Sequence, residues 1–208
     1  MATMKKTTLI LLAILMAVPA LAGGNTYKKK VKELRRAGWE VYASSQTLEE
    51  AVRRHGEALQ KEGVWEISGV SGETRSPAVG AQVAANDACI RYVQQAGRFL
   101  RGRSASDTGS DGGAGSEFSH FYAAYESLLQ KEICGEMRPS FTLVRSGRNG
   151  TVQVMAFYLV DEEAASRARI RALELAASES EAARQIARKS SEYIAEGFVP
   201  EGASADGE

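Results

Sequence analysis

Two histidines and two cysteines are the side chains whose types could support catalysis, but their spacing defines no site. Neither His55 nor His120 has a second ligand three or four residues further on, as a helical metal pair requires. Cys134 follows His120 by 14 residues, and no third group that would orient the histidine stands beside them. The sequence therefore predicts no metal site, no cofactor and no catalytic residue.

A glycine-containing turn and the helix after it carry the candidates for a ligand site. Gly69 and Gly72 follow an apolar segment and precede a helix, where phosphate loops lie, but the Gly-Lys-Ser/Thr ending is missing. Asn86 and Asp87 lie within that helix and could line a pocket, although such residues more often bond locally or face water. These four residues are the candidate site of a small-ligand binder or hydrolase.

Cys89 and Cys134 are candidates for a disulfide. Cys89 falls on the inward stripe of one predicted helix, and Cys134 ends another. In an oxidising compartment the two thiols can form one bridge, which would stabilise the fold by roughly 4 kcal/mol through loop closure. Two buried free thiols are the alternative, and the sequence does not decide between them.

The first 22 residues predict export. Lys5 and Lys6 precede an apolar run over residues 9–18 that is too short to span a bilayer. Small residues then lead up to Ala22, after which we expect cleavage. An uncleaved membrane anchor is the alternative. We expect a periplasmic or secreted protein with no transmembrane segment after cleavage.

The charge balance argues against a nucleic-acid partner. Without Lys5 and Lys6 the chain has 24 basic and 26 acidic residues, so no basic face dominates. A basic cluster over residues 28–36 is the exception. It is either a solvated helix face or a surface that contacts phosphates or anionic lipid headgroups.

Apolar periodicity, caps and turn signals predict the elements that must position these residues. Helices are expected over residues 28–37, 48–62, 77–100, 117–133 and 161–196, and strands over 39–43, 64–75, 141–144 and 151–160. Thr47 and Glu50 form a capping box, and Asn149-Gly150 predicts a hairpin. The stretch from Arg101 to Ser116, rich in glycine and serine, predicts a mobile loop.

These elements predict an α+β fold with a largely antiparallel sheet, in which residues 77–100 and 161–196 cover one face. A parallel arrangement stays possible because whole helices separate the strands. We expect a signal peptide over 1–22, a single α+β domain over 23–199 and a disordered tail over 200–208. The long C-terminal helix would span about 54 Å, so it either overhangs the domain or breaks near residues 178–180.

The segment from Gly69 to Ala96 resembles the motif of LPP20-like envelope proteins, in which a strand ends in glycine and an alanine-rich helix follows a short polar loop. The matching residues here are Gly69, Gly72, Ala81, Ala84, Asn86 and Ala88. More broadly, the chain looks like uncharacterised secreted proteins of Bacteroidetes-type bacteria. The resemblance implies an α+β fold at the cell envelope and no established catalytic residues. Those relatives are often lipoproteins, and this chain lacks their acylated cysteine.

These observations favour an exported cell-envelope protein with a non-catalytic role. The alanine stripe of residues 161–196 would let another helix approach closely, so the expected partner is an unknown envelope protein or a second copy of the chain. Truncation after Ser178 should then abolish association and leave the fold largely intact.

Overall fold

The computed structural model describes residues 24–107, 115–178 and 181–195. The predicted signal peptide (1–22) and the predicted tail (200–208) lie outside them. The elements, in chain order, are α2 (Gly24–Arg36), β1 (Glu40–Val41), α3 (Leu48–Leu59), β2 (Val64–Val70), α4 (Pro77–Asp107), α5 (Gly115–Glu136), β3 (Arg138–Ser146), β4 (Val152–Asp161), α6 (Glu162–Ala177) and α7 (Glu181–Ala195). Among the described helices, none combines the length and apolar character needed to cross a membrane.

The four strands form one antiparallel sheet in the order β1-β3-β4-β2. The β2 strand pairs with β4 along its whole length, from Val64 opposite Asp161 to Val70 opposite Met155. The α+β fold with an antiparallel sheet is therefore confirmed, and the parallel alternative is wrong. At the tip of the β3–β4 hairpin, Asn149 and Gly150 have φ angles of 55° and 73°, as a type I′ turn requires.

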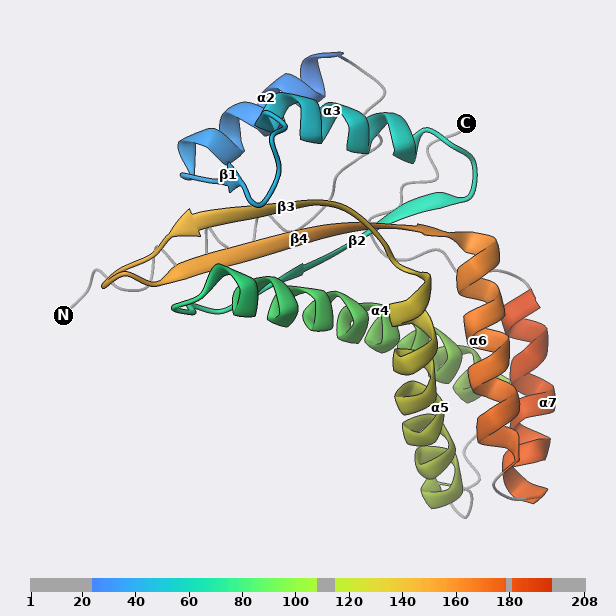
Figure 1. The fold of residues 1–208 in the computed structure, drawn as a ribbon. Coiled ribbons are helices and arrows are strands. Elements are labelled where there is room, and N and C mark those ends of the chain that lie inside the picture. The colour runs from blue at the N-terminus through green and yellow to red at the C-terminus, as the bar shows by residue number, and fades with distance from the viewer. Residues whose placement is uncertain (1–23, 108–114, 179–180, 196–208) are drawn as a thin grey trace.

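Helices cover both faces of the sheet (Figure 1). The α2 and α3 helices pack on one face, where their apolar residues meet Leu143, Met155 and Phe157. The α4 helix packs on the other face, where Ala84 meets Val154 and Ala156. The expectation that residues 161–196 help to cover the sheet is wrong, because α6 leaves the end of β4 and packs with α5 and α7, and α7 in turn contacts α4.

The predicted C-terminal helix is two shorter helices. The α6 helix ends at Ala177, with Ser178 as its C-terminal cap, and α7 begins at Glu181 and returns alongside α6 (Figure 1). Residues 179–180 lie outside the description. The alanine stripe of α6 is fully buried within the protein, through Ala165, Ala168, Ala172 and Ala176. The stripe is therefore not a free surface that awaits another helix.

Several other element boundaries differ from prediction. The β2 strand ends at Val70 and not at residue 75, and β3 extends over residues 138–146 and not only over 141–144. Helix α4 continues to Asp107, and α5 begins at Gly115, so the predicted loop of residues 101–116 is too long, and residues 108–114 are not described. Contacts from α5 support the extension: Arg101 pairs with Glu126, and its guanidinium lies 5.9 Å from the ring centroid of Tyr122. The β1 strand is only two residues long, and Ala43 shortly after it has a φ of 55°.

Candidate functional site

Gly69 serves close packing between β2 and α4. A Cβ atom at this position would lie 2.0 Å from the carbonyl oxygen of Ala84 and 2.4 Å from the backbone nitrogen of Ala88. Real Cβ atoms essentially never approach other atoms so closely. The space beside Gly69, which the sequence predicted as part of a ligand turn, is therefore occupied by the backbone of α4. It has no room for a ligand.

The other three candidates do not converge on one site. Asp87 Oδ2 accepts hydrogen bonds from the backbone nitrogen of Val70 (2.9 Å) and from Arg91 Nε (2.7 Å). The first of these bonds satisfies a backbone amide of the edge strand β2 that does not pair with β4. Asn86 Oδ1 accepts from Gln130 Nε2 of α5 at 3.1 Å. Nothing lies within 4 Å of the Cβ position of Gly72. The structure thus gives Asn86 and Asp87 partners within the fold.

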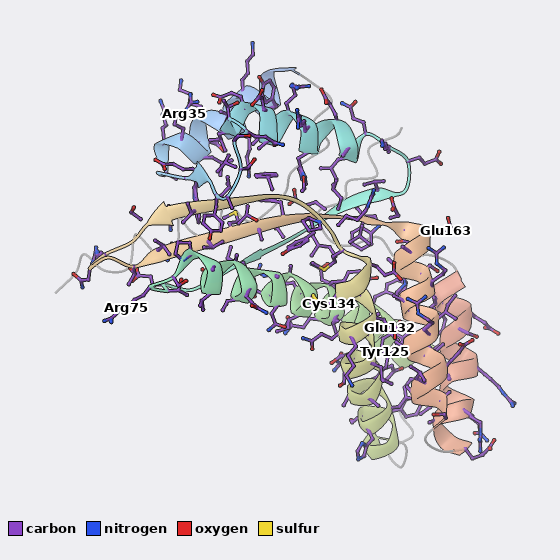
Figure 2. All side chains as sticks on the ribbon, viewed as in Figure 1. Arg35, Arg75, Tyr125, Glu132, Cys134 and Glu163 are labelled. Carbon is purple, nitrogen blue, oxygen red and sulfur yellow. A yellow bond between two sulfur atoms is a disulfide. The ribbon has the colours of Figure 1, made fainter. Side chains whose placement is uncertain are left out.

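Cys89 and Cys134 form a disulfide that joins α4 to α5, with their Cα atoms 5.7 Å apart. Cys89 is buried. Cys134 is exposed in the last turns of α5, where this helix crosses α4 (Figure 2). Of the sequence candidates, these two residues are the pair that the structure brings into direct contact.

A polar cluster that the sequence did not indicate lies beneath α3. His55 is buried, and its Nδ1 atom lies 2.9 Å from Ser140 Oγ while its Nε2 atom lies 2.7 Å from Glu66 Oε2. A register shift between Pro139 and Phe141 in β3 leaves Ser140 at a bulge, and bulges commonly re-aim side chains. Because Ser140 lies 85 residues from His55, no local spacing could have identified the cluster.

This His55 cluster has the components of an acid–base relay. A carboxylate at Nε2 favours the tautomer in which Nδ1 can accept the hydroxyl proton of a serine. The imidazole also meets the rings of Phe141 and Phe157 edge-on, with centroid distances of 5.3 and 5.8 Å. The same contacts tie α3 to β2 and β3, so the cluster also satisfies a buried histidine and holds the α3 layer on the sheet.

An open groove lies along α2 and the start of α3. Its volume is about 570 Å³, and it is lined by Tyr27, Lys28, Val31, Lys32, Arg35, Arg36 and Glu49. The local sequence explains its character, because Val31 and Leu34 turn toward the sheet and are buried. The charged residues between them consequently face solvent.

The charges of this basic groove are largely uncompensated by ion pairs. Arg35, labelled on α2 in Figure 2, pairs with Glu49 at the start of α3. Lys28, Lys32 and Arg36 are exposed, and none of the three forms an ion pair with another described residue. The groove therefore presents a row of accessible cations. The sequence indicated this cluster, but it did not show the hollow between α2 and α3.

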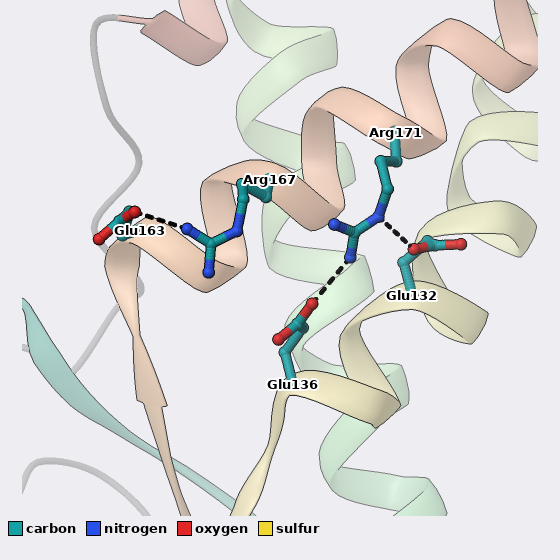
Figure 3. Close-up of polar contacts among 5 residues, drawn as sticks. All are labelled: Glu132, Glu136, Glu163, Arg167 and Arg171. Carbon is teal, nitrogen blue, oxygen red and sulfur yellow. Dashed lines mark hydrogen bonds and ion pairs between the residues drawn. The ribbon is translucent and has the colours of Figure 1, made fainter.

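Along α5 and α6, several acidic and basic side chains pair with each other. On the surface between α5 and α6, Arg171 contacts Glu132 at 2.6 Å and Glu136 at 2.8 Å, and Arg167 contacts Glu163 at 2.6 Å (Figure 3). These pairs hold two helices together or lie along one helix. These charged groups therefore serve contacts within the fold.

A buried charge cluster joins the sheet to the helical bundle. Arg169 of α6 donates from Nη1 to the Tyr92 hydroxyl at 2.7 Å and from Nη2 to Glu162. Trp65 Nε1 of β2 donates to the second oxygen of Glu162 at 3.2 Å. Burial raises the pKa of Tyr92 to about 12 and also raises the pKa of Tyr125. These hydrogen bonds join α6 to α4 and β2, so the cluster is part of the core.

No known family model, curated protein or solved structure matches the chain. Within the described ranges there is also no cluster of three or more His, Cys, Asp or Glu residues that could hold a metal ion. Two features of the chain itself therefore indicate its function, namely the open basic groove and the buried His55 cluster.

Proposed function

We propose that the chain is an exported protein of the cell envelope that acts by binding a partner, and that the basic groove of α2 is its binding surface. The observation that carries the proposal is the row formed by Lys28, Lys32 and Arg36, exposed beside a hollow and without ion-pair partners in the described structure. An accessible row of like charges attracts an occupant of opposite charge. The partner is therefore anionic.

Export is supported by two independent features. The N-terminal pattern fits a signal peptide cleaved after Ala22, and the Cys89–Cys134 disulfide fits an oxidising compartment, since such bridges are rare in the cytosol. The resemblance of residues 69–96 to LPP20-like proteins suggests the same location. The alanine stripe of α6 does not support a helical partner or self-association, because it is already buried within the protein.

Cell fractionation and chemical analysis test this proposal together. The protein recovered from the periplasm or envelope should begin at Gly23 and contain no free thiol under denaturing, non-reducing conditions. High salt should release it from the envelope fraction, because a charged contact is screened by ions. A full-length cytosolic protein with two free thiols would contradict export, and retention that is insensitive to salt would contradict binding through the basic groove.

A serine hydrolase centred on Ser140 is the second candidate. It is favoured by the hydrogen-bonded series Ser140–His55–Glu66. The site of this hydrolase candidate differs from the one expected from the sequence, near Asn86 and Asp87. Binding is better supported because the groove is exposed and His55 is buried. A fluorophosphonate probe should label the wild-type protein and spare the Ser140→Ala variant if this candidate holds. The absence of labelling would leave His55 with its structural role.

A further inference from the structure

We infer that the basic groove docks on the anionic phospholipid headgroups of a membrane leaflet. This inference rests on the proposed function and names its partner. Helix α2 contains six basic residues and one acidic residue, Glu33. Clusters of four to eight Lys or Arg residues on a helix are typical of binding to anionic lipid surfaces.

The spacing of the cations fits a surface better than a single anion. Lys28, Lys32 and Arg36 follow one another at intervals of four residues, so they lie on one side of α2 and extend over about 12 Å. Lys29 is also exposed and widens this row. A single phosphate would contact only part of such a row, whereas neighbouring headgroups can contact all of it.

The inward face of α2 determines the depth of the contact. Val31 and Leu34 are 4% and 1% exposed and pack in the core beneath the helix. The helix therefore has no apolar face available for the acyl chains, in contrast to amphipathic helices that lie within the interface. The contact is confined to the headgroup level and depends on charge.

The position of α2 in the chain also favours a membrane partner. If cleavage follows Ala22, then α2, which begins at Gly24, is the first element of the processed chain. Signal peptides are removed at the membrane, so the helix is next to the leaflet when the protein is released. The processed chain as a whole has 24 basic and 26 acidic residues, so attraction to an anionic leaflet has to come from this local cluster and not from net charge.

Vesicle co-sedimentation of the processed protein tests the inference. Wild-type protein should bind vesicles that contain phosphatidylglycerol and should not bind vesicles of phosphatidylethanolamine alone. The triple variant Lys28→Ala, Lys32→Ala and Arg36→Ala should bind roughly a hundred-fold more weakly, at about 1 kcal/mol per basic residue near the surface. A matched variant, Lys61→Ala, Lys131→Ala and Arg188→Ala, removes the same number of exposed charges elsewhere and should retain binding. Circular dichroism should show that all three proteins are folded.

Several results would overturn the lipid assignment. They are equal binding to both kinds of vesicle, equal weakening by both triple variants, or displacement by inorganic phosphate at constant ionic strength. The last would indicate a discrete anion site. Failure of the proposed function is read separately, from the N-terminal residue and the cellular fraction. If the protein is exported but does not bind phosphatidylglycerol vesicles, the lipid partner is rejected and the proposal of export is retained.

Discussion

At the scale of single residues, Gly69 and Gly72 lead to different predictions although they are only three positions apart in the chain. Gly69→Ala should lower the free energy of unfolding by roughly 1–3 kcal/mol, because its Cβ would overlap the backbone of α4. Gly72→Ala should change it by less than about 0.5 kcal/mol, since the space around this residue is open. Urea denaturation of the two variants measures both values. Equal effects would show that the close packing of β2 on α4 is not what requires Gly69.

The buried tyrosines predict a loss of stability at alkaline pH. Burial raises the pKa of Tyr92 from its ordinary value of 10.0 to about 12 and raises that of Tyr125. The unfolded chain therefore loses these protons first. The stabilisation is fully present below about pH 10 and is lost as the pH rises through 12, with roughly 3 kcal/mol from Tyr92.

Denaturant unfolding at a series of pH values checks this expectation. Tyr125→Phe should make the decline above pH 10 shallower, because one of the two buried phenols is gone. An identical decline in the wild-type protein and the variant would mean that Tyr125 does not contribute to it.

Short-range signals identified some residues correctly, and long-range contacts escaped them. Thr47 and Glu50 form the predicted capping box, with Glu50 Oε2 2.9 Å from the Thr47 nitrogen. This motif is complete within four residues, so the sequence contains all of it. The partners of His55 come from β2 and β3, and a lone histidine in a helix does not show which strand will pass beneath it. The uncompensated cations of α2 were visible, but the groove depends on how α3 packs beside them.

At the scale of elements, α7 predicts the effect of C-terminal truncation. Its buried residues join the main core, namely Ala183, Ile186, Ala187, Tyr193 and Ile194. Removal of everything after Ser178 should therefore lower stability by about 5 kcal/mol or more, since a fully buried isoleucine alone contributes roughly 1.5–3 kcal/mol. The sequence had predicted that this truncation would leave the fold largely intact and abolish association. The structure predicts instead that the fold itself is destabilised.

Truncation after Ala195 is the matched control, because it retains the whole of α7. Thermal unfolding and binding of a hydrophobic dye should distinguish the two truncated proteins. If the protein truncated after Ser178 unfolded at the temperature of the wild type and bound no dye, α7 would be dispensable for the core.

Helix boundaries were the least predictable features of the elements. Residues 101–107 contain no large apolar side chain, so the spacing of apolar residues cannot indicate a helix there. The extension of α4 is supported instead by the pairing of Arg101 with Glu126 of the next helix. The hairpin was predictable for the opposite reason: Asn149 and Gly150 adopt positive φ angles readily, and the turn depends on them alone.

At the scale of the whole molecule, α4 connects two halves. Its 31 residues extend over about 46 Å, first across the sheet and then along α5 and α7 (Figure 1). The antiparallel sheet was predictable from its strands. The arrangement of helices around it was not, because an apolar stripe shows that a helix is covered without showing what covers it.

Arg169 lies where these halves meet, and its replacement should weaken both. Arg169→Ala removes a buried side chain and the hydrogen bonds that it gives to Tyr92 and to the partly exposed Glu162, which should cost about 2–5 kcal/mol. Hydrogen exchange should accelerate in β2 and in α5 alike. Arg167→Ala, which breaks the exposed pair with Glu163, should change stability by less than about 0.5 kcal/mol. Faster exchange in the bundle alone would show that the halves unfold separately.

The strand order β1-β3-β4-β2 imposes a sequence of events on folding. The two N-terminal strands do not pair with each other, and both depend on the hairpin of residues 138–161. Val64 must find Asp161, and contacts between such distant residues form slowly because a long loop has to close first. The sheet consequently cannot assemble while only the first half of the chain has emerged from a ribosome. Such a delay would suit the export that we propose, because a chain that folds late can still cross a membrane unfolded.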